Sequence, residues 1–337
     1  MPVIDVHAHI ITRGMVESIA STGTTVVPSF VEADGGVYLQ RGEKFRFGVI
    51  PHAIHDVDLR IREMNQQGVD MQALAVAPMI MGYEQNPEIG KRVAQTINES
   101  ILDVARSHPT RFAVVGSLPM QDPDAAVEEI VRIAADPMVR AVQIGTHVEE
   151  LNLDAPKFEA VWAQLVDSDL GVIVHPNATA RSERLRRYHL GNLIGNPTDS
   201  TVAIASLIFG GVPDRHPHLR FAFLHGGGFA PYQIGRWDHG WVCRAEAKEV
   251  ISEPPSRYLS RFYFDSLTHD RLSLEFLGRR VGWDHVVLGS DYPFDMSDRD
   301  PVAKVRVLGL SGEEESRVLS ANGEALLRRS GLDWDET

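Results

Sequence analysis

Eight short runs of apolar and β-branched residues recur along the 337-residue chain, and most are followed by a segment with helical spacing. Near-continuous apolar runs of this kind are typical of parallel strands that are buried on both faces. Eight strands alternating with helices predict an α/β fold, a (β/α)8 TIM-like barrel, rather than a doubly wound sheet. The predicted strands are Val3–Val6, Gln72–Val76, Phe112–Val115, Ala141–Ile144, Gly171–Val174, Arg220–Leu224, Phe262–Phe264 and His285–Leu288.

Helices are expected between these strands, because several of the intervening segments open with Asp or Pro and carry Glu in the first turn. The chain contains no internal repeat and no interdomain linker, so we expect one domain over residues 1–337. The predicted helices are Asp56–Gln67, Pro87–Ser107, Asp122–Ala135, Pro156–Asp167 and Ser200–Phe209.

One connection is much longer than the fold requires. Residues 7–71 separate the first two predicted strands, whereas a complete βα unit needs about thirty residues. Residues 35–47 resemble two short strands around an Arg-Gly turn at Arg41. We therefore expect a small β insertion over the mouth of the barrel, spanning about residues 13–55.

Composition excludes several classes of partner. A net charge of −13 argues against nonspecific binding to nucleic acid or to an anionic membrane surface. The single cysteine, Cys243, excludes a disulfide scaffold and fits a reducing cytosol. Neither a signal peptide nor a run long enough to cross a bilayer is visible. We expect a cytoplasmic protein with no nucleic-acid and no membrane partner.

Residues that can bind a metal ion lie at the ends of several predicted strands. His7 and His9 end the first strand, His175 ends the fifth, His225 ends the sixth and Asp291 follows the eighth. In such barrels the C-terminal ends of the strands face the active site, and side chains at i and i+2 share one face. Imidazole and carboxylate groups together suit a divalent transition metal, most often zinc. In a chain with 14 histidines the His-x-His tripeptide alone is weak, so the prediction rests on the joint placement.

The same placement predicts a single ion. Residues 143–147, at the end of the fourth strand, contain no lysine that could be carboxylated to bridge two metals. We predict one divalent ion, zinc with manganese as the alternative, in an open site that leaves room for water or substrate. His225 is then free to act as the catalytic acid or base beside the ion, with a fifth ligand as its alternative role. The predicted ligands are His7, His9, His175 and Asp291.

Longer motifs surround these residues and extend over nearly the whole chain. They are Ile4–His9, His175–Pro176, Asn196–Thr201, His225–Phe229, Gly235–Arg236, Gly289–Phe294 and Leu319–Leu326. Together they resemble the amidohydrolase superfamily, in its amidohydrolase-2 branch of metal-dependent decarboxylases. The resemblance implies one zinc held by the predicted ligands, His225 as acid or base, and a homodimer.

The resemblance also implies that two arginines bind substrate carboxylates. Arg46 on the β insertion and Arg236 after the sixth strand match these positions, and Arg236 is expected to reach the cavity of a neighbouring subunit. A guanidinium fork suits a planar carboxylate, while an ordinary surface charge is the alternative for either residue. Where members of the branch that act on carboxymuconate semialdehydes place a tryptophan, this chain has Asn192, which leaves the substrate open.

These observations predict a metal-dependent carbon–carbon lyase that needs no organic cofactor. The expected reaction is nonoxidative decarboxylation of a small anionic substrate, an unsaturated or aromatic carboxylate of the carboxymuconate semialdehyde or hydroxybenzoate type. The first alternative is a hydrolase or hydratase that uses a metal-activated water on a lactone, an amide or a carbon–carbon double bond. The second is a noncatalytic barrel that binds a ligand or a protein, and it does not require the predicted ligands to converge.

Overall fold

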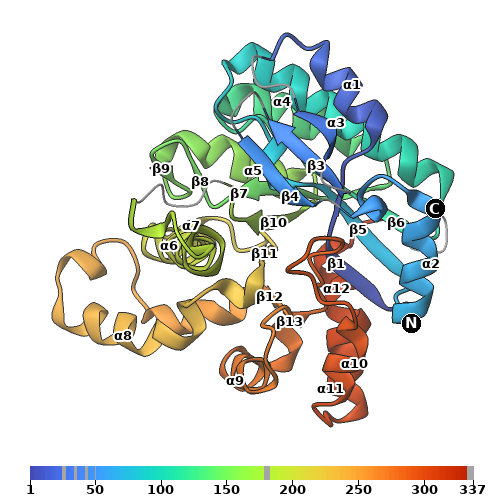
Figure 1. The fold of residues 1–337 in the computed structure, drawn as a ribbon. Coiled ribbons are helices and arrows are strands. Elements are labelled where there is room, and N and C mark those ends of the chain that lie inside the picture. The colour runs from blue at the N-terminus through green and yellow to red at the C-terminus, as the bar shows by residue number, and fades with distance from the viewer. Residues whose placement is uncertain (25–27, 34–35, 42–44, 50, 178–182, 332–337) are drawn as a thin grey trace.

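The computed structural model describes residues 1–24, 28–33, 36–41, 45–49, 51–177 and 183–331. Eight parallel strands form one sheet that curves into a nearly closed barrel, with helices around its outside (Figure 1). The predicted α/β barrel is therefore confirmed. Around the sheet the strands follow chain order, as β1 (Ile4–Ile10), β5 (Met71–Val76), β6 (Phe112–Ser117), β7 (Val139–Gly145), β10 (Gly171–His175), β11 (Phe221–Phe223), β12 (Phe262–Asp265) and β13 (Val286–Val287).

Strand β1 is joined to the segment around β13, which brings the two edges of the sheet together. The amide of Val6 donates to the carbonyl of Leu288 at 2.9 Å, and a parallel bridge links Ala8 to Tyr292. Because these partners continue past Val6, β1 extends to Ile10 and includes both histidines of the His-x-His motif. The apolar run stops at Val6, but the strand continues through His7 and His9, which were predicted to end it, because the polar histidines do not interrupt the backbone ladder.

The predicted helices are all present, and side-chain caps fix several of their first residues. Asp56 accepts from the amide of Leu59, and Asp122 accepts from the amide of Ala125. Residues 156–158 form a 3-10 turn before α5. The helices are α1 (Arg13–Ala20), α2 (Val57–Gln67), α3 (Pro87–Ser107), α4 (Pro123–Ala134), α5 (Glu159–Asp167), α6 (Asn196–Phe209), α7 (Val212–Arg215), α8 (Ala230–Cys243), α9 (Arg271–Val281), α10 (Pro301–Arg306), α11 (Gly312–Ser316) and α12 (Asn322–Leu327).

The long connection after β1 contains a small antiparallel sheet of β2 (Pro28–Ala33), β3 (Gly36–Arg41) and β4 (Phe45–Val49). Strands β3 and β4 correspond to the predicted insertion. Strand β2 and a short hairpin of β8 (His147–Val148) and β9 (Leu151–Asn152) were not predicted. Leu39 of β3 is fully buried in the same core cluster as Ile10, so the insertion packs on the barrel.

The interior of the barrel is filled with apolar side chains at the end opposite the histidines. Ile4, Val6 and Ile173 pack there with Leu326 and Leu327 of α12, which closes that end. A larger cluster fills the space between the strands and the surrounding helices. The ends of the strands that carry His7, His9 and His175 are therefore the open ends of the barrel. No helix within the described ranges has the length and apolar content needed to cross a bilayer.

Candidate metal centre

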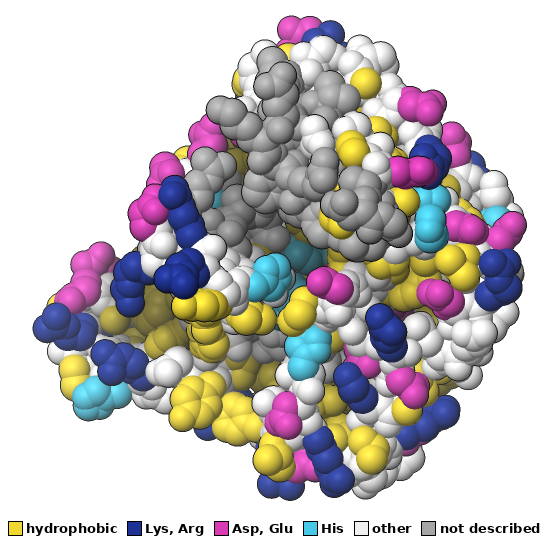
Figure 2. Space-filling view, viewed as in Figure 1, with side chains coloured by type: hydrophobic (Ala, Val, Ile, Leu, Met, Phe, Trp, Pro, Cys, Tyr) yellow, Lys and Arg dark blue, Asp and Glu magenta, His cyan; other side chains and the backbone are white. Residues whose placement is uncertain are grey.

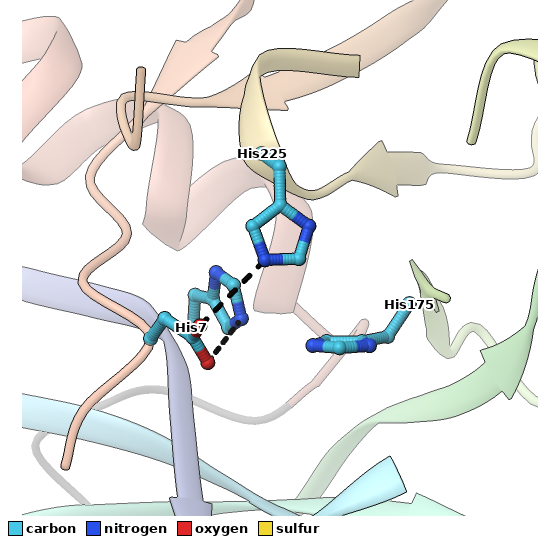
Figure 3. A group of neighbouring side chains, drawn as sticks. His7, His175 and His225 are labelled. Atoms are coloured by element: carbon cyan, nitrogen blue, oxygen red, sulfur yellow. Dashed lines mark ion pairs between the residues drawn. The ribbon is translucent and has the colours of Figure 1, made fainter. Parts of the chain in front are cut away.

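Four histidines and one aspartate meet at the C-terminal ends of the strands. His7 and His9 lie on β1, His175 is the last residue of β10, His225 follows β11, and Asp291 follows β13. His7 and His9 are 1% and 0% exposed, and both rings turn toward the centre of the barrel. Figure 3 shows His7, His175 and His225 pointing toward one another, with His225 on the helical turn that follows β11.

The nitrogen and oxygen atoms of this group lie close enough to share one ion. Ligand atoms of His7, His175, His225 and Asp291 all lie within 4.8 Å of one another. His9 joins them, because its Nε2 is 3.1 Å from Oδ1 of Asp291 and its ring centroid is 5.0 Å from that of His175. The structure therefore brings together all five of these sequence-predicted residues.

The inward-facing ring nitrogens fit a metal. The Nε2 atoms of His7, His9 and His175 are buried and make no hydrogen bond of regular geometry within the described residues, although those of His7 and His9 lie 3.2 and 3.1 Å from Oδ1 of Asp291. The other nitrogen of each ring is occupied: Nδ1 of His7 bonds Asp265, that of His9 bonds the Val76 carbonyl, and that of His175 bonds the Pro176 carbonyl. An Nδ1–H held in this way leaves the Nε2 lone pair facing inward, as a metal ligand requires.

Electrostatics within the group also favour a cation. Burial alone lowers the pKa of His7, but the charges of Asp291 and Asp265 outweigh this and raise the pKa to about 10. Burial lowers the pKa of His9 and of His175, which keeps both rings neutral. Burial raises the pKa of Asp291, yet the His7 charge and bonds from the histidines bring the net pKa well below its usual range. At neutral pH and without a metal, the group thus holds an ionised Asp291, a protonated His7 and neutral rings at His9 and His175.

Two of the five residues have an unusual backbone. His225 and Asp291 have φ of 55° and 60°, in the left-handed region that residues other than glycine rarely adopt. After His225 the chain runs through Gly228, where a Cβ atom would lie 2.1 Å from the carbonyl oxygen of Pro197. Strained backbone held in place by its surroundings is typical of functional sites.

A cavity of about 580 Å³ opens beside the metal centre, with His225 and Asp291 in its wall. Most of the remaining wall is apolar, including Phe229, Leu267 and Phe276. Figure 2 shows histidine side chains in the hollow of this face, with hydrophobic side chains gathered beside it. A cavity of this size and lining suits a small, mostly apolar organic molecule with a polar end at the metal centre.

A family model described as Amidohydrolase matches residues 4–329 of the chain. The chain belongs to the amidohydrolase family. The resemblance inferred from the motifs is thereby confirmed.

Three known proteins illustrate the relationship. This amidohydrolase is 37% identical over 247 residues to the 2-amino-3-carboxymuconate-6-semialdehyde decarboxylase of Dictyostelium discoideum, covering 73% of this chain and 69% of that protein. The fold matches 5-carboxyvanillate decarboxylase from Sphingomonas paucimobilis with a TM-score of 0.82 at 23% identity, over 98% of this chain and 99% of the other. It also matches a dihydroxybenzoic acid decarboxylase from a Polaromonas species, with bound manganese and the inhibitor 2-nitroresorcinol. There the TM-score is 0.79 at 18% identity, over 98% of this chain and 99% of the other.

One important residue of this amidohydrolase site was not predicted. Asp265, the last residue of β12, is fully buried, and its Oδ2 accepts from Nδ1 of His7 at 2.7 Å. Its Oδ1 accepts from the amides of Gly226 and Leu267 at 2.7 and 3.3 Å. The rule that found the histidines could have found Asp265, because it too ends a predicted strand.

A buried polar network below the site was also not predicted. Asp5 accepts from the amide of His7 and from both the amide and the hydroxyl of Ser290. Gln72 donates to Asp5 and accepts from Arg60, which donates in turn to the carbonyl of His9. No short sequence motif predicts this network, because its members are distant in sequence and come into contact only in the folded barrel.

The structure places the residues that the resemblance links to the substrate in different positions. Asn192 lines the cavity, at the position where the resemblance led us to expect a tryptophan. Arg236 lies exposed on α8 and does not line the cavity of its own chain. Arg46 belongs to β4, but its side chain lies outside the described part of the structure. The roles of both arginines therefore stay predictions.

Proposed function

We propose that this chain is a metal-dependent nonoxidative decarboxylase of an unsaturated or aromatic carboxylate. The observation that carries the proposal is the convergence of three buried, inward-facing Nε2 atoms on Asp291, which lines an apolar cavity. Relatives named as decarboxylases of carboxymuconate semialdehyde, carboxyvanillate and dihydroxybenzoic acid support it. The proposed substrate carries a hydroxyl, amino or oxo group next to the carboxylate.

The proposed reaction needs a proton at the carbon that bears the carboxylate. A divalent ion held by His7, His9, His175 and Asp291 would supply Lewis-acid polarisation of a substrate oxygen. His225 lines the cavity beside Asp291 and is the group placed to hold and transfer the proton. When that proton reaches the carbon, carbon dioxide leaves, and the electrons of the broken bond restore the conjugated system. No organic cofactor is required, because the substrate itself accommodates the electrons.

For the metal we propose zinc, with manganese as the alternative. Three neutral imidazoles and one carboxylate are a ligand set that zinc commonly accepts. Manganese is bound in the Polaromonas relative, and imidazole with carboxylate also suits that ion. Metal analysis of the protein as purified, followed by reconstitution with each ion, distinguishes the two.

We also propose a homodimer in which Arg236 enters the cavity of the second subunit and binds a substrate carboxylate. Arg236 is exposed on α8, where a neighbouring chain can be reached. Exposed apolar side chains, Tyr232 of α8 and Leu272 and Phe276 of α9, lie along the cavity on the same side of the barrel. Light scattering measures the oligomeric state, and Arg236→Ala should raise KM for carboxylate substrates without loss of metal.

The proposal also includes the domain organisation of the chain and its location in the cell. We infer that residues 1–337 form one domain, because α12 packs against β1, with the Cβ position of Gly323 3.3 Å from Ile4. A single cooperative unfolding transition would support this. We also propose a cytoplasmic location, which Cys243 supports because it is exposed and forms no disulfide. Fractionation of cells that express the tagged protein would test it.

The function is tested by offering the metal-loaded protein 2,6-dihydroxybenzoate, 5-carboxyvanillate and 2-amino-3-carboxymuconate 6-semialdehyde. We expect one molecule of carbon dioxide to be released for each molecule of substrate lost. The organic product should contain no oxygen from labelled water. Turnover of a lactone or amide with uptake of labelled oxygen would favour the hydrolase alternative instead. If none of these acids is decarboxylated, the proposal is wrong.

A further inference from the structure

A second imidazole lies in the wall of the cavity, outside the metal centre. His269 follows β12 and lines the cavity together with His225 and Asp291. Among the lining residues that the structure describes, these three are the two histidines and the one carboxylate. His225 and Asp291 belong to the metal centre, whereas His269 has no role in the reaction proposed above.

The backbone of His269 resembles that of the two site residues. Its φ is 59°, beside 55° for His225 and 60° for Asp291. Left-handed backbone is unfavourable for residues other than glycine, and it persists only where the surrounding structure imposes it. The two histidines and the aspartate of the cavity wall thus share a positive φ.

The loop that carries His269 is held from both sides. The amide of Ser266 donates to the carbonyl of Val287 at 2.9 Å, and the amide of Thr268 donates to the carbonyl of Ser266 at 2.9 Å. On the other side Asp270 caps α9 by accepting from the amide of Ser273 at 2.9 Å. The His269 ring is therefore presented to the cavity by a fixed loop.

The ring nitrogens of His269 are available to bond a ligand. Within the described ranges it makes no hydrogen bond and no ion pair, although its neighbours in the loop are bonded. Partial burial lowers the pKa of His269, and the nearby Lys304 and His225 lower it further. A neutral imidazole offers one donor and one acceptor, so it can bond a hydroxyl, an amino group or an oxo group.

We propose that His269 is a specificity residue that binds a second polar substituent of the substrate, beyond the group held at the metal centre. This inference rests on the proposed function and narrows its substrate class. The substrate would be a planar conjugated acid that carries its carboxylate and one oxygen or nitrogen substituent at the metal, and a further hydroxyl, amino or oxo group facing His269. Acids with this second group, such as 2,6-dihydroxybenzoate, are then preferred over acids without it, such as 2-hydroxybenzoate.

The test uses ligands that cannot react. Calorimetry would compare binding of 2-nitroresorcinol, which has two ring hydroxyls, with 2-nitrophenol, which has one, to the metal-loaded protein. The variant is His269→Gly, because glycine adopts a φ of 59° without strain while the imidazole is lost with the rest of the side chain. His189→Gly is the matched control, since His189 has a φ of 57° and does not line the cavity.

We expect the wild-type protein to bind the dihydroxy ligand about 5- to 10-fold more tightly, the value of one added hydrogen bond. His269→Gly should bring the two affinities within about twofold of each other, whereas His189→Gly should leave the preference unchanged. His269→Asn tolerates the backbone and keeps a donor and an acceptor, so it should restore part of the preference. Equal preference in wild type and His269→Gly, or none in the wild type, would overturn the proposal.

These outcomes are separable from the fate of the decarboxylase proposal. If the binding preference depends on His269 but no acid releases carbon dioxide, the proposed reaction is wrong while the substituent site stands. If acids are decarboxylated but the preference is independent of His269, the reaction stands and His269 is structural. Where turnover is measurable, His269→Gly should raise KM for 2,6-dihydroxybenzoate and leave kcat within about threefold, since binding at a distance from the reacting carbon is lost.

Discussion

Replacement of Asp265 by asparagine should weaken metal binding even though Asp265 itself does not face the ion. Oδ1 of Asp265 accepts from the amides of Gly226 and Leu267, so that position must keep an acceptor. In Asp265→Asn the amide oxygen is therefore held there, and the amide NH2 is turned toward Nδ1 of His7. Two donors would then face each other where a 2.7 Å hydrogen bond now stands.

The ring of His7 can relieve this conflict only by moving its proton. Nδ1 would become the acceptor and Nε2 would carry the hydrogen, which removes the lone pair that faces Asp291 and the predicted ion. Loss of a carboxylate behind a metal-bound histidine typically weakens binding about 10- to 100-fold, or about 1.4 to 2.7 kcal/mol. Because the tautomer is reversed as well as the charge removed, we expect the upper part of that range.

The assay is competition for zinc between the protein and a chelator of known affinity, at pH 7.5. Asp122→Asn is the control, because Asp122 caps α4 and asparagine is an equally good cap. The control should bind zinc as the wild type does. Zinc affinity in Asp265→Asn within twofold of wild type would refute the argument that Asp265 sets the tautomer of His7.

Two further predictions follow from the same structure. Because nearby carboxylates raise the pKa of His7 to about 10, the metal-depleted protein at pH 7.5 carries this proton, and binding of zinc should release about one proton, measured by calorimetry in buffers of different ionisation enthalpy. Release of none would mean that His7 is already neutral. Gly228→Ala should cost about 2 to 5 kcal/mol in the free energy of unfolding, since its φ is 63° and its Cβ would lie 2.1 Å from the oxygen of Pro197. In the control Gly235→Ala, in α8, the new Cβ meets no atom within 4 Å. This variant should raise the free energy of unfolding by about 0.5 to 1 kcal/mol. Thermal unfolding of both variants and the wild type measures these changes.

The barrel was predictable because each buried strand is a continuous apolar run with little ambiguity of period. The metal centre was predictable because parallel strands bring their C-terminal ends together, so His175 and Asp291 could be placed with His7 and His9 despite their separation in sequence. The same reasoning covers Asp265, which ends β12, but its role behind His7 depends on a tertiary hydrogen bond that no sequence pattern contains.

Other features depend on tertiary contacts that a sequence pattern does not contain. The end of β1 is set by partners near Leu288 and Tyr292, which come from the far end of the chain. The hydrogen bond from Arg60 to the carbonyl of His9 likewise exists only after β1 and α2 have packed together. The positive φ of His269, on which the specificity proposal partly rests, could not be predicted because the loop contains no glycine.

The central claim is that His7, His9, His175 and Asp291 hold one divalent ion on which decarboxylation depends. It is tested most directly by measuring metal content and carbon dioxide release in the same sample after chelation and stepwise return of zinc or manganese. We predict that release rises in proportion to bound metal, up to one ion per chain, and that His175→Ala abolishes both. Full carbon dioxide release from metal-free protein, or bound metal that is unaffected in His175→Ala, would contradict the account.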